Sequence, residues 1–255
     1  MAYSRDEALE LHKDYQETVN NWQYYVRSYN GGYDYTLGQY LNRYNLELDN
    51  EFNQRLANTP CDNHCKNIIQ IYSSFLFRVN ASRDFGSMQA ESSLESFLKD
   101  ADLEGNSFTT VMKQAQNYAS IYGHCFLILD KPPVQTNTKA EELDQDIRPY
   151  VSMVTPENVL DWNFERQING KYQLNYLKIR EEVDKSGGSY MRLWFPDRVD
   201  TIYVEDIGTE PTLIDTATNQ IGKIPAVILY NAKSHKRGIG QSDLVDIADL
   251  QKAIY

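Results

Sequence analysis

The sequence predicts an α+β fold, in which a helical first half is followed by a mostly antiparallel β region and a final helix. Three observations support this prediction. Up to Gly123 the apolar residues recur at helical spacing. After Gly123 they form short apolar runs of strand length, with glycines between several of them. Helical spacing returns in the last segment, residues 242–255.

The first half is expected to contain five helices. The first begins at a capping box, in which Glu7 follows Ser4 by three residues, and ends at Asn30-Gly31-Gly32. Its expected apolar face consists of Ala8, Leu11, Tyr15, Val19 and Trp22. The second covers about residues 36–56 and is broken by Thr59-Pro60. The third covers about residues 62–77, which are rich in isoleucine and phenylalanine.

The last two of these helices have N-terminal signals of their own. Ser92 with Glu95 predicts a capped short helix. Ser107 opens a longer helix that ends at Gly123. Its apolar stripe is formed by Val111, Ala115, Tyr118, Ala119 and Tyr122.

The β region begins with residues 124–130, a buried strand stopped by Pro132-Pro133. Residues 134–148 are polar and acidic and are expected to form an exposed loop. Further strands are expected at residues 150–154, 173–180, 190–195, 201–205 and 226–230. Gly170 and Gly187-Gly188 provide turns of the hairpin type.

These patterns divide the chain into a helical region over 1–106, an α+β domain over 107–241 and the start of a helix over 242–255. Residues 250–255 contain no glycine, proline or cap, so we expect that the sequence is part of a longer polypeptide.

The net charge of −11 argues against tight electrostatic binding of DNA, which requires a surplus of lysine and arginine. The acidic excess is also explained by solubility alone. No apolar run approaches the roughly 20 residues of a membrane span, and no leader peptide opens the sequence. A soluble protein of a cytoplasm is therefore expected.

Two residue types invite a functional interpretation. Cys61 and Cys65 flank His64, but their spacing and the lack of a second Cys/His pair favour reduced thiols over a zinc site. Tyrosine occurs 19 times, and nine copies precede residue 46. Tyrosine suits protein–protein contacts, although an aromatic helical core explains the same pattern. The candidate interface residues are Tyr24, Tyr25, Tyr29, Tyr33, Tyr35 and Tyr40.

The segment Gly238-Ile239-Gly240-Gln241-Ser242 has the position of a dinucleotide fingerprint, because it follows a predicted strand and precedes a predicted helix. Asp243 stands where the third glycine belongs, so we interpret the segment as a helix-opening turn. No Walker A sequence or Gly-x-Ser-x-Gly elbow occurs. No cofactor is expected. An enzyme using Asp130, Glu157 and Asp161 is the third alternative for the function.

Six blocks of the second half together resemble the portal proteins of tailed bacteriophages. In order they are YASIYGHCFLILDKP at 118–132, RPY at 148–150, TPENVLDW at 155–162, LNYLKIRE at 174–181, YMRLWFPD at 190–197, and IPAVILYN at 224–231 with SDLVDIADLQKAIY at 242–255. The resemblance covers roughly residues 107–255.

The resemblance implies a non-enzymatic ring subunit, usually of a dodecamer, at one capsid vertex of the virion. DNA passes through such a ring without sequence preference. The implied partners are further copies of the chain, the major capsid protein, the scaffold protein, the terminase large subunit and the head–tail adaptor. Assembly takes place in the host cytoplasm. Residues 107–241 resemble the wing of a portal subunit, and the last helix resembles the start of its stem.

The strongest alternative is another phage structural or adaptor protein that has no DNA channel. Within the portal hypothesis, Asp243, Asp246 and Asp249 recur every third residue of the last helix and are expected to share one acidic face. That face is either directed toward the channel or is an ordinary solvated surface.

Overall fold

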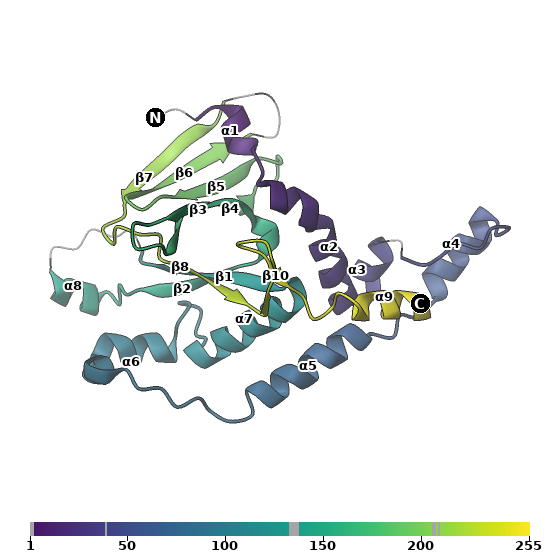
Figure 1. The fold of residues 1–255 in the computed structure, drawn as a ribbon, viewed down its shortest axis with the longest axis horizontal. Helices are drawn as coiled ribbons and strands as arrows, with labels where there is room; N and C mark the ends of the chain where they lie inside the picture. Colours follow the sequence, from purple (N-terminus) through teal and green to yellow (C-terminus); the bar gives the residue numbers. More distant parts are fainter. Residues whose placement is uncertain (1–2, 39, 133–137, 206–207, 209) are drawn as a thin grey trace.

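The computed structural model describes residues 3–38, 40–132, 138–205, 208 and 210–255. It confirms the α+β class. A five-stranded sheet and a three-stranded sheet lie one above the other, and helices cover the outer side of the smaller sheet (Figure 1). Helices α2, α5 and α9 extend from this body toward a projecting end, where α4 lies (Figure 1).

The described helices, with two 3-10 turns labelled η, are α1 Arg5–Leu9, α2 Lys13–Asn30, α3 Gly32–Leu37, α4 Asp49–Asn58, α5 His64–Leu76, η1 Gly86–Ala90, α6 Ser92–Lys99, α7 Phe108–Tyr122, α8 Lys139–Asp144, η2 Pro156–Asn158 and α9 Ile247–Ile254. The described strands are β1 His124–Asp130, β2 Tyr150–Val154, β3 Val159–Arg166, β4 Tyr172–Val183, β5 Ser189–Trp194, β6 Arg198–Val204, β7 Thr212–Thr218, β8 Ala226–Tyr230, β9 Ala232–Lys233 and β10 Gly240–Gln241.

Both large sheets are antiparallel. The smaller sheet has the order β2-β1-β8, and the larger one is a meander of β3, β4, β5, β6 and β7. Strand β1 is central in its sheet, with Phe126 opposite both Val154 and Ile228. The turns at Gly170 and Gly187 have positive φ angles of 79° and 88°, which explains the glycines predicted there.

The first predicted helix is divided in two. Its capping box at Ser4 and its end at Gly31 are confirmed. The helix stops after Leu9, and His12 then caps a new one, because its Nδ1 accepts from the Asp14 N–H at 3.1 Å. The His12 N–H donates to the Leu160 carbonyl at 3.0 Å and so joins the break to the start of β3.

The second predicted helix, over residues 36–56, is wrong. The structure has α3 over residues 32–37 and α4 over residues 49–58, and residues 40–48 between them are irregular. The Arg55 guanidinium bonds to the Glu47 carboxylate and to the Asn42 carbonyl, and these bonds fold the irregular segment back onto α4. The helix predicted at Ser92 exists as α6, but the capping bond does not, because Glu91 precedes it without a side-chain bond.

In the β region, β1, β2 and β8 have the predicted bounds, and β4, β5 and β6 agree within three residues. The apolar pattern of the sequence did not predict strands β3 and β7. Helix α8 lies where a loop was expected, and residues 134–137 of that stretch fall outside the described residues. The final helix begins at Ile247 and not at Ser242.

The main core is shared by the helices and both sheets. Its buried members come from helices α1, α2, α5, α7 and α9, from strands β1, β3, β4, β5 and β6, and from the connecting segments. They include Ala8, Trp22, Ile69, Tyr122, Phe126, Leu177, Ile202, Leu244 and Ala248. Because Trp22 of α2 and Phe126 of β1 belong to the same cluster, the N-terminal helices pack as part of the body that contains the sheets.

A buried lysine attaches α1 to the large sheet. Lys178 of β4 has no exposed surface, and its ammonium donates to the carbonyls of Glu7 at 3.1 Å, Ala8 at 3.3 Å and Glu10. These carbonyls end α1 and lack donors within the helix, so the cation satisfies them. Burial nevertheless lowers the pKa of Lys178.

Candidate functional site

The glycine segment 238–242 forms a close backbone contact with the end of α7. A Cβ atom on Gly240 would lie 1.9 Å from the Gly123 carbonyl oxygen, and one on Gly123 would lie 2.5 Å from the Gly240 oxygen. The Gly240 N–H already donates to Nδ1 of His124 at 3.3 Å. The helix-opening interpretation is wrong, because the segment pairs as β10 and α9 begins several residues later. At this point the backbones of Gly123 and Gly240 are in direct contact.

The residues after Gly240 satisfy the C-terminal carbonyls of α7. Ser242 Oγ donates to the Ile121 carbonyl at 2.5 Å and accepts from the Leu244 N–H at 2.9 Å. The Asp243 N–H donates to the Ser120 carbonyl at 2.9 Å. The last carbonyls of a helix have no donors within it. The Gly-x-Ser motif therefore attaches the C-terminal segment to α7.

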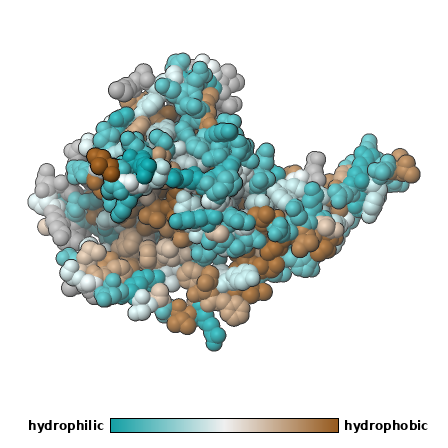
Figure 2. All heavy atoms as spheres, in the orientation of Figure 1, coloured by the Kyte–Doolittle hydropathy of each residue, from teal (hydrophilic) through white to brown (hydrophobic). Residues whose placement is uncertain are grey.

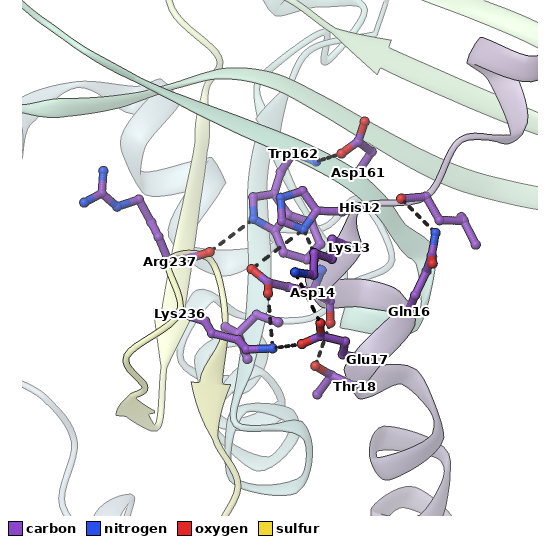
Figure 3. A network of polar contacts seen from close by, with 12 residues as sticks. His12, Lys13, Asp14, Gln16, Glu17, Thr18, Asp161, Trp162, Lys236 and Arg237 are labelled. Carbon is purple, nitrogen blue, oxygen red and sulfur yellow. Dashed lines mark hydrogen bonds and ion pairs between the residues drawn. The ribbon is translucent and has the colours of Figure 1, made fainter.

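Trp162 of β3 lies on the other side of this segment (Figure 3). His12 stacks on its ring, with centroids 4.1 Å apart and planes at 15°. Its Nε1 donates to the Arg237 carbonyl at 3.2 Å. A Cβ atom on Gly238 would lie 2.4 Å from Nε1, and Gly238 has a φ of 89°. Glycine is therefore required at this position for two separate reasons.

Lys236 joins the same loop to the first turn of α2 (Figure 3). Its ammonium lies 3.1 Å from Asp14 and also contacts Glu17. The bond from Lys236 lowers the pKa of the Glu17 carboxyl group. Both carboxylates lie near the N-terminus of the helix, where negative charge is favourable.

Glu157, in η2, forms hydrogen bonds with residues of both α7 and α2. The Tyr122 hydroxyl donates to its carboxylate at 2.8 Å, and the Tyr15 hydroxyl donates to its carbonyl at 2.9 Å. Burial, followed by the charge of Glu157, raises the pKa of Tyr122. One contact region, which we call the joint, therefore contains the end of α7, the Pro-Glu-Asn turn, Trp162 and segment 238–244. These residues belong to the sequence segments that resemble portal proteins. In the structure those segments pack the chain's own elements together.

The three carboxylates considered for catalysis have different surroundings. Asp130 pairs with Arg192 at 2.7 Å. Glu157 is held by tyrosines as described. Asp161 lies near Lys178, and burial raises the pKa of its carboxyl group. The structure does not assemble them into one acid–base pair.

The cysteines also lie in surroundings that disfavour thiolates. Cys65 is fully buried, and burial raises its pKa to about 12. Burial raises the pKa of Cys61 as well. The Cys65 N–H donates to the side-chain oxygen of Gln251 at 3.0 Å, which joins α5 to α9. Within the described part of the chain, no three His, Cys, Asp or Glu residues are grouped so that they could hold a metal ion.

All three candidate channel aspartates are exposed. Their expected arrangement on one helical face is wrong, because Asp243 and Asp246 precede the first residue of α9. Asp243 accepts from the side-chain amide of Asn231 at 2.7 Å, and Asp249 accepts from the Tyr24 hydroxyl at 3.1 Å. They form a short acidic stretch that starts at the joint and continues into the helix.

The six candidate interface tyrosines differ in exposure. Tyr35 has no exposed surface, and its ring contacts those of Tyr40 and Tyr255 at 4.8 Å and 5.1 Å. The Tyr24 hydroxyl donates to the Ala248 carbonyl at 2.8 Å. Tyr25, Tyr29 and Tyr40 are half-buried. Tyr33, with 77% of its surface exposed, is available to a partner. Tyr24, Tyr35 and Tyr40 thus connect the N-terminal helices to the C-terminal segment.

Two exposed apolar surfaces lie away from the joint, and the sequence pattern did not identify them as surfaces. The first, which we call the α5 ridge, is the exposed side of the C-terminal half of α5 and the residues just beyond it: Ile71, Tyr72, Phe75, Leu76 and Val79, each more than half exposed. Figure 2 shows apolar residues gathered along this helix. The second, which we call the arm, is residues 43–58, where Leu46 is 96% exposed.

No described helix is both long and apolar enough to cross a membrane. The chain is thus an α+β protein whose sequence motifs pack its own elements together and which exposes two apolar surfaces.

A family model described as "Phage portal protein, SPP1 Gp6-like" matches residues 14–254. The chain therefore belongs to the phage portal proteins of the SPP1 Gp6-like family, which confirms the resemblance seen in the sequence. The match also includes most of the N-terminal helices, where no portal motif was recognised. No curated protein matches the chain.

Proposed function

We propose that this portal protein is the subunit of a closed ring at one capsid vertex, through which DNA is packaged and ejected. The observation that carries the proposal is the presence of two unlike apolar surfaces, the arm and the α5 ridge, on a chain of the portal family. A cyclic ring needs two different surfaces on each subunit, because each copy contacts one neighbour through one surface and the second neighbour through the other.

Passage of DNA is supported by charge. A channel that lets a polyanion slide must not present many cations that hold its phosphates. The chain carries a net charge of −11, and the exposed Asp243, Asp246 and Asp249 lie together near its C-terminal helix. We propose that these three aspartates are directed toward the channel.

The proposed partners are those of a ring at a vertex: further copies of the chain, the major capsid protein, the scaffold protein, the terminase large subunit and the head–tail adaptor. Tyr33 is the candidate tyrosine that remains most open to such contacts.

The test is negative-stain imaging, together with native mass measurement, of the protein expressed from its complete gene. Cyclic particles with a central hole are expected. A uniform monomer or small dimer at all protein concentrations would contradict the ring, and would favour the alternative of a phage structural or adaptor protein without a DNA channel.

Replacing Asp243, Asp246 and Asp249 together by asparagine tests the acidic channel surface. Asparagine keeps the oxygens that accept from Asn231 and Tyr24, so the fold is expected to persist. Because three negative charges per subunit are lost, the packaged length or the retention of DNA should change. The control changes three other exposed carboxylates of the large sheet and its turns to their amides, Glu165→Gln, Glu182→Gln and Asp197→Asn. Unchanged packaging in the first variant would remove these aspartates from the channel.

A further inference from the structure

The arm holds its shape by its own polar contacts. Arg55 donates two hydrogen bonds of 2.8 Å to the Glu47 carboxylate and one of 2.7 Å to the Asn42 carbonyl. Arg43 pairs with Asp49 at 2.7 Å. A paired, bidentate arginine of this kind fixes geometry as well as charge. The arm is therefore shaped before it meets any partner.

The same arm buries no apolar residue within its own chain. Helix α4 has no buried residue, and it projects away from the body (Figure 1). Leu46 is 96%, Tyr44 68% and Leu48 61% exposed. An isolated helix of this length is marginal in water, and most helical stability in proteins comes from packing of an apolar face. Helix α4 therefore gains no stability from a buried apolar face within the described part of the chain.

The α5 ridge is the continuation of a surface that is already used inside the molecule. At the start of α5, Cys65 and Ile69 are buried against the neighbouring helices. Tyr72 and Leu76 follow on the same side of the helix at spacings of three and four residues, yet they are 60% and 64% exposed. On a different side of the helix is an open hollow of about 590 Å³, lined by Asn67, Gln70, Ile71, Ser74, Phe75 and Arg78.

Charge favours a second copy of this chain as the occupant. Residues 63–83 contain Lys66, Arg78 and Arg83 and no aspartate or glutamate, within a chain whose net charge is −11. The arm carries three carboxylates, at 47, 49 and 51, and two cations, at 43 and 55, so its net charge is −1. The α5 ridge thus lies in a stretch of chain that carries cations and no carboxylates, and it can receive an acidic, apolar projection.

We propose that the arm of one copy packs on the α5 ridge of the next copy, with Leu46 and Leu48 against the hollow beside Ile71 and Phe75. This inference rests on the proposed ring and names its contact. The arm and the ridge are different surfaces, so the contact is heterologous and repeats from copy to copy until the ring closes.

Cysteine cross-linking tests the contact in the protein expressed from its complete gene. Leu46→Cys with Phe75→Cys, treated with a short bismaleimide, should yield a ladder of covalent multimers in denaturing gels. The matched control combines Leu46→Cys with Ile168→Cys, because Ile168 is fully exposed on the turn between β3 and β4. The unchanged protein reports any background from Cys61, which is half-buried, while Cys65 and Cys125 are buried.

A second variant does not depend on cross-linking. Leu46→Arg should lower the yield of rings at least about tenfold, a loss of about 1.4 kcal/mol per contact or more, and should leave the melting temperature of the dissociated subunit unchanged. Ile168→Arg should leave the rings intact. Normal ring formation by Leu46→Arg would overturn the contact but not the ring. So would rings of the Leu46→Cys, Phe75→Cys variant that give no more cross-linked multimers than the control. Absence of rings in the unchanged protein would overturn the proposed function itself.

Discussion

At the scale of single residues, Gly123 and Gly240 leave the least space for a side chain in the joint. Their backbones approach so closely that neither position has space for a Cβ atom. Gly123 also has a φ of 94°, which favours glycine on its own account, whereas Gly240 is restricted by contact alone. The cost of a methyl group at Gly240 therefore measures the closeness of the contact.

Gly240→Ala should lower the free energy of unfolding by about 3 kcal/mol, the upper end of the range for overpacking, because two backbone segments must separate. Urea denaturation at constant m-value measures this. Gly222→Ala is the control, since Gly222 has a φ of 69° but nothing within 4 Å of its Cβ position; its cost should be about 1 kcal/mol. Equal costs for the two variants would show that the contact is unimportant.

His124 is the other residue with an unusual environment. It is fully buried beside Trp22 and Phe126, with ring centroids 5.6 Å away in each case. Burial lowers its pKa to about 3, so the folded state keeps the imidazole neutral. In the unfolded chain the ring takes up a proton near its ordinary value of 6.5. Since the unfolded state then binds more protons, stability must fall as the pH falls from 6.5 toward 3.

Between pH 6.5 and pH 5 the free energy of unfolding should decline with a slope approaching about 1.4 kcal/mol per pH unit from this residue alone. His124→Asn retains an acceptor for the Gly240 N–H but does not titrate in this range. The variant should be less stable at pH 7, and its slope should be flatter by about one proton. Denaturation curves at several pH values provide the comparison, and identical slopes would disprove the assignment.

At the scale of elements, the C-terminus of α7 is held by a segment more than a hundred residues later in the chain. Ser242 is buried and makes one donor and one acceptor bond there. Ser242→Ala should destabilise the protein by about 1–3 kcal/mol, since the Leu244 N–H and a helix carbonyl lose their partner. Ser74→Ala on the exposed side of α5 should change stability by less than about 0.5 kcal/mol. Urea midpoints that do not separate the two variants would argue against this cap.

The sequence predicts best the elements whose periodicity and end signals agree. Helix α7 has a serine cap, an unbroken apolar stripe and a terminal glycine, and β1 follows it directly. Strand β7 escaped prediction because all seven of its residues are exposed, so no apolar alternation marks it. The break between α1 and α2 depends on a backbone bond from His12 to the distant Leu160, which local spacing does not encode.

The same limit applies to the candidate site. The Gly238–Ser242 motif was recognised, but its role depends on contacts with Gly123, Trp162 and Ile121, which are remote in sequence. The three aspartates would share one helical face only if the helix began at Ser242. Ser242 instead precedes α9 and donates to a C-terminal carbonyl of α7. Tyr35 illustrates the converse, because composition cannot distinguish a buried tyrosine from one at an interface.

At the scale of the whole molecule, the body is held by a core that both sheets share, whereas the arm depends on a neighbour. Hydrogen exchange should therefore be fast for the α4 amides of the dissociated subunit and slower by about tenfold or more in rings. Helix α7, which lies in the core, should exchange slowly in both states. Mass-spectrometric exchange on separated subunits and rings makes this comparison. Equal rates for α4 in the two states would contradict an arm that packs on a neighbour.

The exposed edge of β7 affects the concentration that the free subunit can reach before it aggregates. Strand β7 ends the large sheet, and its outer edge pairs with no described strand. Leu213 and Ile214 are 40% and 54% exposed. Free apolar edges are templates for stacking into aggregates, and a charge within the strand opposes this. Asp215, in the middle of β7, therefore acts as a gatekeeper. Its charge opposes the stacking of these edges as the concentration of free subunits rises.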